Sequence, residues 1–242
     1  VIQGCTFAIN DLGIGLKRAS HRNVIQDNEF YDTIFDWPWD AVKSGSELET
    51  GGIRFYDPAT GRGNIIRRNA FHDFFDGFGV CPEWTDGRCS NVRIWGNTFH
   101  NVLMGISLAP VYTGPVYAIR NLIHRTGAGN NEYSGSPFKF NSGYGRSGPM
   151  YLFHNTCDAA LPDNDGLMIG EPGTWEVIVA RNNIWAGTSY ALTNYNPSQR
   201  LDLDYDDLYT TLPGELAWWA GLPDRHLNTL AELRAATGQE LH

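Results

Sequence analysis

Two cations in similar local settings are the first candidates for chemistry. Lys139 stands between Phe138 and Phe140. Burial among apolar side chains lowers the pKa of a lysine enough for its amine to act as a general base. Arg54 stands in the related tripeptide Ile53-Arg54-Phe55. Both cations could also hold anionic groups of a bound molecule. A solvated surface charge is the competing interpretation of each.

A histidine with nearby carboxylates is the second candidate. His72 precedes Asp73, and Asp76 follows shortly after. A histidine beside a carboxylate suits acid–base work, and two carboxylates suit Ca²⁺. Asp76-Gly77 is also a typical turn sequence, so a simple turn is the competing interpretation.

Aromatic residues gather in the segments around these candidates. An exposed ring offers a flat apolar face on which the C–H face of a sugar can pack. The rings in question are Trp37, Trp39, Tyr56, Trp84, Tyr112 and Tyr144. Glu47, Glu49 and Glu83 share these segments and could supply a carboxylate pair or Ca²⁺ ligands. Their separation is not fixed by sequence, so retaining and inverting hydrolysis both stay open. Loop packing is the competing interpretation for any one ring.

A repeat positions all of these residues. In each copy a polar residue ends an apolar strand, and an apolar residue follows two places later. The polar residues are Cys5, Asn28, Asn69, Asn97, Asn121, Asn155 and Asn182, followed by Phe7, Phe30, Phe71, Phe99, Ile123, Cys157 and Ile184. Three places before them stand Ile2, Ile25, Ile66, Ile94, Ala118, Leu152 and Val179. A period near two dozen residues, stretched by insertions, is typical of a solenoid.

A second pattern lies between the polar positions. A small residue precedes a tripeptide that alternates in-out-in, which is strand periodicity and too short for a helix. The examples are Gly13 before Ile14-Gly15-Leu16, Gly52 before Ile53-Arg54-Phe55, Gly77 before Phe78-Gly79-Val80, Gly105 before Ile106-Ser107-Leu108, Pro137 before Phe138-Lys139-Phe140, and Gly166 before Leu167-Met168-Ile169. Three short strands per repeat predict an all-β fold, a single-stranded right-handed parallel β-helix of about seven coils with three parallel sheets.

Stacking explains why the polar residue is asparagine. Successive coils lie about 4.8 Å apart, so the amides of one column can bond those above and below. A buried amide is stable only when its donors and acceptors are paired, and a column achieves this. The bend also favours a residue that tolerates the left-handed conformation, for which Asn is the usual non-glycine choice.

Indexing on the asparagines assigns two outward columns. The first holds Gly15, Arg54, Gly79, Ser107, Lys139 and Met168. Arg54 and Lys139 lie three coils apart, about 14 Å, too far to act on one bond. The second holds Ala8, Tyr31, His72, His100, His124, Asp158 and Trp185. Histidines in a row do not converge like a metal cage, so a solvated ladder is the simpler interpretation.

Composition limits the class of protein. The 242 residues carry a net charge of −9 and contain no apolar run of membrane-spanning length, which argues against nucleic-acid binding and a membrane span. An acidic polysaccharide could still bind through a bridging cation. Cys81 and Cys89 could close a local bridge, which favours a secreted or periplasmic setting. Cys5 and Cys157 are predicted to be core thiols.

One domain is expected, with the solenoid over 1–210 and a tail over 211–242. In the tail, Thr229 and Glu232 fit a capping box, Asn228–Thr237 a short helix and Gly238 its stop. Val1 already lies in register, which predicts a piece of a longer protein with further coils. Self-association through an open end is the alternative.

The repeating units carry a family resemblance. Units such as Asn64-Ile65-Ile66-Arg67-Arg68-Asn69-Ala70-Phe71 resemble the right-handed parallel β-helix repeats of pectate-lyase-like proteins, over about residues 1–192. The resemblance implies an inner Asn ladder and a carbohydrate groove along the G-I-x-F strand. It also implies that Lys or Arg can serve as the base of a lyase. The chain has no match to the Asp motifs of polygalacturonase-like hydrolases, to D-P-H-D or to R-x-P-x-x-R.

From these patterns we expect a polysaccharide lyase that performs β-elimination on a uronic-acid glycan. Lys139 or Arg54 would be the base, with His72 and Asp76 as further catalytic candidates and Asp73 with Asp76 as a metal site. The expected substrate-binding residues are Trp37, Trp39, Tyr56, Glu83, Trp84, Ser107 and Tyr144. The alternatives are a glycoside hydrolase with a carboxylate pair and a non-catalytic glycan-binding, adhesin-like or tailspike-like solenoid. No cofactor other than Ca²⁺ is expected.

Overall fold

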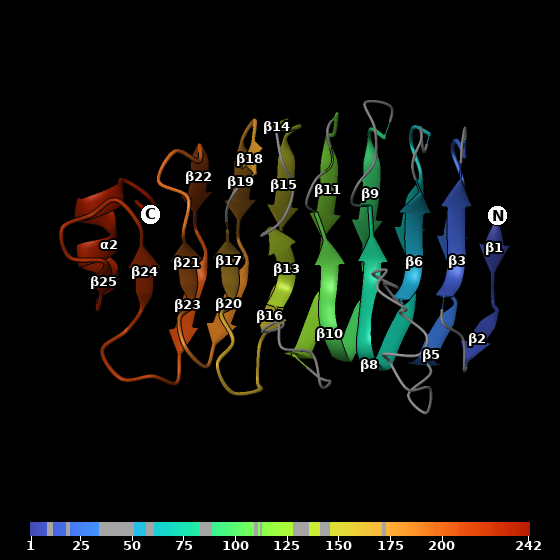
Figure 1. Cartoon of the computed structure of the whole chain (residues 1–242), viewed down its shortest axis with the longest axis horizontal. Coiled ribbons are helices and arrows are strands. Elements are labelled where there is room, and N and C mark those ends of the chain that lie inside the picture. Colours follow the sequence, from blue (N-terminus) through green and yellow to red (C-terminus); the bar gives the residue numbers. More distant parts are fainter. Residues whose placement is uncertain are drawn as a thin grey trace, which may run out of the picture.

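The fold is nearly all β, with parallel strands stacked along one axis (Figure 1). The computed structural model describes residues 1–8, 12–17, 20–33, 51–56, 61–82, 89–108, 111, 113–127, 136–140, 146–170 and 173–242. Among them one helix, α2 (Leu230–Thr237), closes the C-terminal end of the stack. The rest of the regular structure forms strands of two to 12 residues.

An eight-stranded parallel sheet forms one side of the stack. Its strands, in spatial order, are β1 (Ile2–Gln3), β4 (Val24–Gln26), β7 (Ile65–Arg67), β9 (Val92–Trp95), β11 (Val116–Ile119), β15 (Met150–Phe153), β19 (Ile178–Arg181) and β22 (Leu201–Asp204). Each pass of the chain adds one strand, so sequence order and spatial order agree. β14 (Arg146–Ser147) and β18 (Thr174–Trp175) form a separate pair.

A 15-stranded sheet forms the other two sides and has two legs. The lower leg in Figure 1 contains β2 (Thr6–Ala8), β5 (Glu29–Thr33), β12 (Leu122–Thr126), β16 (Thr156–Asp158), β20 (Ile184–Gly187) and β23 (Asp207–Thr210). The middle leg contains β3 (Leu12–Lys17), β6 (Gly51–Tyr56), β13 (Ser136–Phe140), β17 (Leu167–Ile169), β21 (Leu192–Asn194), β24 (Ala217–Trp219) and the antiparallel β25 (His226–Leu227). β8 (Ala70–Cys81) and β10 (Thr98–Ser107) run through both legs and join them.

A column of buried asparagines links the successive repeats. The Nδ2 of Asn28, Asn69, Asn97, Asn121 and Asn155 donates to the Oδ1 of the next asparagine at 2.9–3.1 Å. Each backbone N–H donates to the same oxygen, and each Nδ2 also donates to a backbone carbonyl, such as that of Ile25. The column thus pairs amides that would be costly if buried alone. It ends on a carboxylate, because Asn183 Nδ2 donates to Asp206 Oδ1 at 2.9 Å.

The seventh copy of the predicted repeat was indexed one residue too early. Asn183, not Asn182, lies in the column, and Trp185 is therefore fully buried while Ile184 is 40% exposed. The predicted outward position of Trp185 is wrong and belongs to Ala186, which pairs with Asp158. The error arises because Asn182-Asn183 precedes Ile184-Trp185, so two registers fit one pattern. A slip of one residue moves every side chain to the opposite face.

The left-handed residue at this bend is the one before the ladder asparagine, which corrects a second expectation. Residues of many types adopt φ between 52° and 65° there: Gly4, Asp27, Arg68, Gly96, Arg120, His154, Asn182 and Tyr205. Asparagine is therefore retained for the hydrogen bonds of its amide and not for its backbone tolerance. The non-glycine residues accept a costly conformation at a bend that the flanking strands fix.

Stacked phenylalanines fill the core beside the asparagines. The ring centroids of Phe7, Phe30, Phe71 and Phe99 are 4.7, 4.7 and 4.8 Å apart, with nearly parallel rings. Gly79 lies over this stack, where an added Cβ would meet the Phe99 ring at 2.3 Å. No other residue fits that close approach.

The position of Gly79 corrects the predicted outward column. Arg54 pairs with Cys81 and not with Gly79, because β8 has two more residues than β10 between matched positions. Phe74 still pairs with Val102, and Phe78 with Met104. The tripeptide of this repeat therefore begins after Gly79, two residues later than predicted.

The cysteines and the tail complete the comparison with the sequence. Cys157 is buried as predicted, but Cys5 is exposed because β1 and β2 have a neighbouring strand on one side only. Cys81 and Cys89 are both buried, and their bridge stays a prediction. The helix prediction is confirmed: Thr229 caps α2 by accepting from the Glu232 N–H, and Gly238 ends it at φ 67°. In the part of the chain that the structure describes, no helix has the length and apolarity to span a membrane.

Candidate functional site

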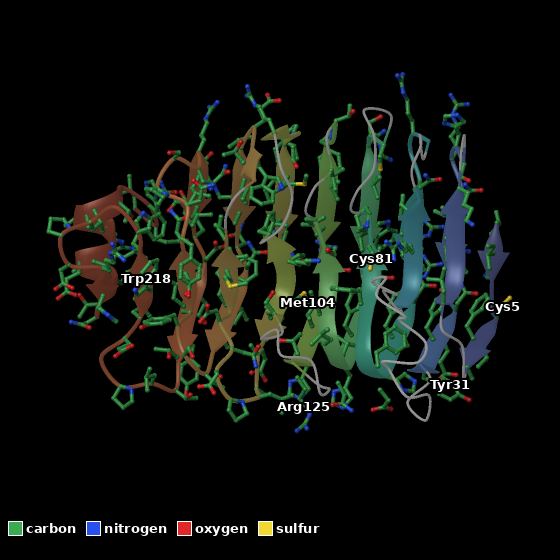
Figure 2. All side chains as sticks on the ribbon, viewed as in Figure 1. Cys5, Tyr31, Cys81, Met104, Arg125 and Trp218 are labelled. Atoms are coloured by element: carbon green, nitrogen blue, oxygen red, sulfur yellow. The ribbon has the colours of Figure 1, made fainter. Side chains whose placement is uncertain are left out.

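The outward side of the middle leg, here called the middle face, carries the predicted cation column. In register it runs through Gly15, Arg54, Cys81, Ser107, Lys139, Met168, Thr193 and Trp218. Figure 2 shows Cys81, Met104 and Trp218 along this row of strands. Arg54 and Lys139 lie three strands apart, as predicted, so they do not meet at one bond.

Lys139 and Ser107 have different environments on this face. Lys139 is half-buried between Ser107 and Met168, and its Nζ lies 4.9 Å from the centroid of the Phe78 ring. Ser107 is fully buried and therefore does not face solvent as a sugar-binding hydroxyl would. Lys139 thus sits on an aromatic face, an arrangement that favours the charged amine.

His72 and Asp73 contact each other, and Glu29 and Asn101 add further hydrogen bonds. His72 Nδ1 lies 2.9 Å from Asp73 Oδ2, and its Nε2 lies 3.3 Å from Glu29 Oε1. Burial lowers the pKa of His72, but the bonds to Asp73 and Glu29 outweigh it and the pKa is raised. Asp73 also accepts from Asn101 Nδ2 at 2.9 Å. No group of three metal-ligating side chains gathers among the described residues.

Several predicted residues lie outside the described part of the chain. These are Trp37, Trp39, Glu83, Trp84 and Tyr144. The backbones of Tyr56 and Asp76 are described in β6 and β8, but their side chains are not. The structure therefore leaves these seven assignments as predictions.

A second outward column on the middle face holds the residues that the sequence indexing missed. It stands three places before the cation column. Its members are Leu12, Gly51, Phe78, Met104, Ser136, Asp165, Tyr190 and Glu215. The N-terminal half is apolar, and Phe78 and Met104 pack with Cys81 and Leu103. The C-terminal half is polar and titratable, which makes it the better place for chemistry.

Asp165, Tyr190 and Glu215 form successive rungs of this polar half. Each stands two residues before a strand of the middle leg, and these strands pair in register. The Tyr190 backbone N–H donates to Asp165 Oδ1 at 3.2 Å. The Tyr190 hydroxyl lies 3.2 Å from His226 Nδ1, which in turn lies 3.7 Å from Glu215 Oε2. Two carboxylates therefore flank one tyrosine, with a histidine beside it.

The electrostatics of this group favour a protonated carboxyl. Burial raises the pKa of Asp165 to about 6, against the opposing effect of Thr193 and the Tyr190 N–H. Burial, the hydrogen bond to Glu215 and the negative charges of Glu215 and Asp165 raise the pKa of Tyr190. Tyr190 therefore stays a neutral donor, and Asp165 exchanges a proton near neutral pH. A carboxyl with such a pKa is suited to general acid catalysis.

An aromatic pair lies next to these groups. The ring centroids of Tyr195 and Trp218 are 4.6 Å apart at a tilt of 41°. Tyr195 is 43% exposed, and the guanidinium carbon of Arg225 lies 5.5 Å from the Trp218 ring centroid. Burial, followed by the charge of Asp165, raises the pKa of Tyr195. The pair offers a partly exposed apolar surface near the Asp165 carboxyl.

The repeat itself contained the signal for this site. Asp165 is one residue before Gly166, in the same register as Ser136 before Pro137. Indexing that position along all repeats would have aligned Asp165 with Tyr190 and Glu215. In the last two repeats Ala191 and Leu216 replace the Gly or Pro that precedes the tripeptide, so the sequence pattern does not extend to Tyr190 and Glu215.

Comparisons with known proteins add no relative: no family model matches the chain, and no characterised protein or solved structure matches it significantly.

Proposed function

We propose that this protein is a carbohydrate-active right-handed parallel β-helix of the pectate-lyase-like type. It binds a polysaccharide across the middle face and hydrolyses it there. Three observations support the fold: strands added one per pass, parallel pairing in both large sheets, and the stacked asparagine amides. The resemblance of the repeating units and the polar half of the middle face support the activity.

Tyr195 and Trp218 provide the binding surface in this proposal. A pyranose ring presents C–H groups on one face, and aromatic rings bury such surface at little conformational cost. Arg225 beside Trp218 would hold a carboxylate or hydroxyl group of the same sugar. The sugar that stacks here lies next to the Asp165 carboxyl.

Asp165 acts as the general acid, and Glu215 as the general base. Asp165 donates its proton to the glycosidic oxygen as the bond to the anomeric carbon breaks. Glu215 takes a proton from the water that attacks that carbon, and Tyr190 holds the two carboxylates in place. Proton return from Glu215 to Asp165 through solvent resets the site. The sum is one water added across one glycosidic bond.

The spacing of the two carboxylates favours inversion at the anomeric carbon. Asp165 and Glu215 stand two rungs apart, and rungs are about 4.8 Å apart, so their backbones are separated by about 9.6 Å. Inverting glycosidases hold their carboxyl groups roughly 6.5–9.5 Å apart, with room for a water molecule, whereas retaining enzymes hold them at about 5 Å. The backbone separation is at the upper limit of the inverting range, so side chains that lean toward each other would bring the carboxyl groups within it.

The single observation that carries the proposal is the half-buried Asp165, with a pKa of about 6, beside an exposed aromatic pair. A panel of neutral and uronic-acid polysaccharides, assayed for new reducing ends, tests it. Wild-type protein should release reducing ends from at least one glycan, and Asp165→Asn should reduce that rate by about 100-fold or more. Asp163→Asn, an exposed neighbour, is the matched control and should retain activity. Unchanged activity in Asp165→Asn would remove Asp165 from the mechanism.

A lyase with Lys139 as its base remains the second candidate. Its support is the half-buried position of Lys139 in the column that the resemblance assigns to the carbohydrate groove. The contact of its amine with the Phe78 ring favours the charged form and so opposes a role as base. Elimination gives an unsaturated product that absorbs in the ultraviolet, whereas hydrolysis does not. Ultraviolet-absorbing product that is lost in Lys139→Ala would favour the lyase. Glycan binding without turnover by the wild type would favour the non-catalytic alternative.

A further inference from the structure

We propose that the outward face of the eight-stranded sheet carries a second binding site, for an anionic polysaccharide. Four arginines around Trp95 form it: Arg67, Arg68, Arg93 and Arg120. This arginine patch lies on a different sheet from Asp165. The choice of a polysaccharide rests on the proposed function, whereas the affinity of the patch for anions does not.

Trp95 is the centre of the patch. It is half-buried on β9, and the guanidinium carbons of Arg67 and Arg68 lie 5.3 and 5.9 Å from its ring centroid. Arg67 Nε donates to Gln26 Oε1 at 2.7 Å, so a neutral amide fixes this cation without neutralising it. Stacked guanidinium groups keep N–H donors at their edges for an incoming anion.

Register places the other two arginines on the same surface. Arg93 and Trp95 stand two residues apart on one strand, so both side chains face outward. Arg120 is exposed at the left-handed bend, as Arg68 is two repeats earlier. Gly96 holds the bend position between them and contributes no side chain. The backbones of Arg68 and Arg120 therefore stand two rungs, about 9.6 Å, apart on either side of Gly96.

The arginine patch is positively charged, whereas the whole chain carries a net negative charge. Among the described residues, Asp27 is the carboxylate that pairs with the patch, at 2.7 Å from Arg68 Nε. Four positive charges and one negative charge leave a surplus of three, in a chain whose net charge is −9. At the far end of the sheet, by contrast, Asp202 pairs with Arg181 at 2.5 Å. A local surplus of this kind concentrates anions near the surface.

An apolar strip extends from the patch along the sheet. Tyr117, which pairs with Arg93, stacks on Tyr151 with ring centroids 5.1 Å apart, and Tyr151 lies 5.9 Å from Phe153. These side chains are half-buried, with Tyr117 on β11 and both Tyr151 and Phe153 on the next strand, β15. Apolar rings next to cations fit a polymer that has both apolar ring faces and acidic groups.

Binding measurements on variants of the full chain test the proposal. Wild-type protein should bind polygalacturonate at low salt, and Arg93→Gln with Arg120→Gln should weaken that binding by about tenfold. High salt should remove most of the difference, because exposed charges are screened. Arg146→Gln with Arg200→Gln, two exposed arginines outside the patch, is the matched control for the loss of two positive charges.

The outcomes separate the patch from the proposed hydrolysis. The patch lies on a different sheet from Asp165, so an absence of catalysis in the wild type would leave this binding result intact. Unchanged binding in the double variant would overturn the patch. Equal binding of a neutral glycan, or tighter binding of single-stranded DNA than of polygalacturonate, would overturn the anionic polysaccharide as its partner.

Discussion

Individual carboxyl and imidazole groups in this protein take their properties from their place in a column. Asp165 is flanked by the rung that carries Tyr190, and burial raises its pKa to about 6. His72 is flanked by Asp73 and Glu29, which raise its pKa against the effect of burial. His100 lies on the next rung, where burial and the charge of His124 lower its pKa. Neighbours above and below thus set the proton affinity of each group.

The two histidines should therefore titrate in a fixed order. In a two-dimensional NMR titration of the imidazole resonances, His72 should protonate at a higher pH than His100. Asp73→Asn should lower the pKa of His72, because it removes one of the two carboxylates. Since the folded-state pKa of His72 is raised, its contribution to stability is present at acid pH and is lost as pH rises through that pKa. Reversed order of the two titrations would contradict the described contacts.

At the scale of strands and bends, register decides which side chains can act. Two places after a ladder asparagine the side chain points into the core, as at Phe71 and Phe99. Three places after it the side chain points outward, as at His72 and His100. Where one asparagine follows another, as at Asn182 and Asn183, the pattern alone cannot choose. The hydrogen bond from Asn155 to Asn183 makes the choice, and it buries Trp185.

This register has a measurable energetic consequence. Trp185 is fully buried, and its Nε1 donates to Asp206 Oδ2 at 3.0 Å. Trp185→Ala should therefore lower the free energy of unfolding by about 3–5 kcal/mol, because it opens a cavity and removes this bond. Ile184→Ala, one residue earlier on the exposed face, should change it by roughly 0.5 kcal/mol or less. Chemical denaturation of both variants compares them. A larger loss in Ile184→Ala would contradict the register.

Much of the arrangement of strands follows from the sequence, and part of the site does not. The asparagine column, the core phenylalanines and the capped helix at Thr229 are local patterns that the structure confirms. The two-residue excess in β8 is invisible to a pattern that tolerates insertions. The sequence patterns do not identify Asp165, because its candidate role depends on Tyr190 and Glu215, which lie 25 and 50 residues away in the sequence. Burial and charge at such a distance appear only once the rungs are stacked.

At the scale of the whole molecule, two neighbouring acidic residues, Asp206 and Glu240, lie where the C-terminal tail meets the last repeat. The Asp206 N–H donates to Glu240 Oε2 at 3.1 Å, and Glu240 is buried. Burial and the charge of Asp206 raise the pKa of Glu240 to about 8, and burial raises the pKa of Asp206. Asp204 adds negative charge beside Glu240, while the Arg234 side chain donates to the Glu240 carbonyl. A proton kept on Glu240 therefore removes one of two neighbouring negative charges where the tail meets the last rung.

Stability of the whole chain should fall as pH rises from about 5 to about 8. The folded protein keeps the Glu240 proton over this range, whereas the unfolded chain has lost it. Glu240→Gln keeps the size of the side chain without its charge, so its stability should change less over the same range. Denaturation midpoints at several pH values measure this, with the exposed Glu176→Gln as the control. Parallel curves for wild type and Glu240→Gln would contradict the raised pKa of Glu240.

The most direct test of the central claim is the pH dependence of glycan cleavage by the wild-type protein and Asp165→Asn. Because the acid must be protonated to act, the rate of the wild type should fall as pH rises above the Asp165 pKa of about 6. The cleavage rate of the variant should be low at every pH and should not show this fall above about pH 6. Proton NMR of freshly formed product should show the inverted anomer. A wild-type rate that does not fall above about pH 6, or an Asp165→Asn variant with the full rate, would contradict the account.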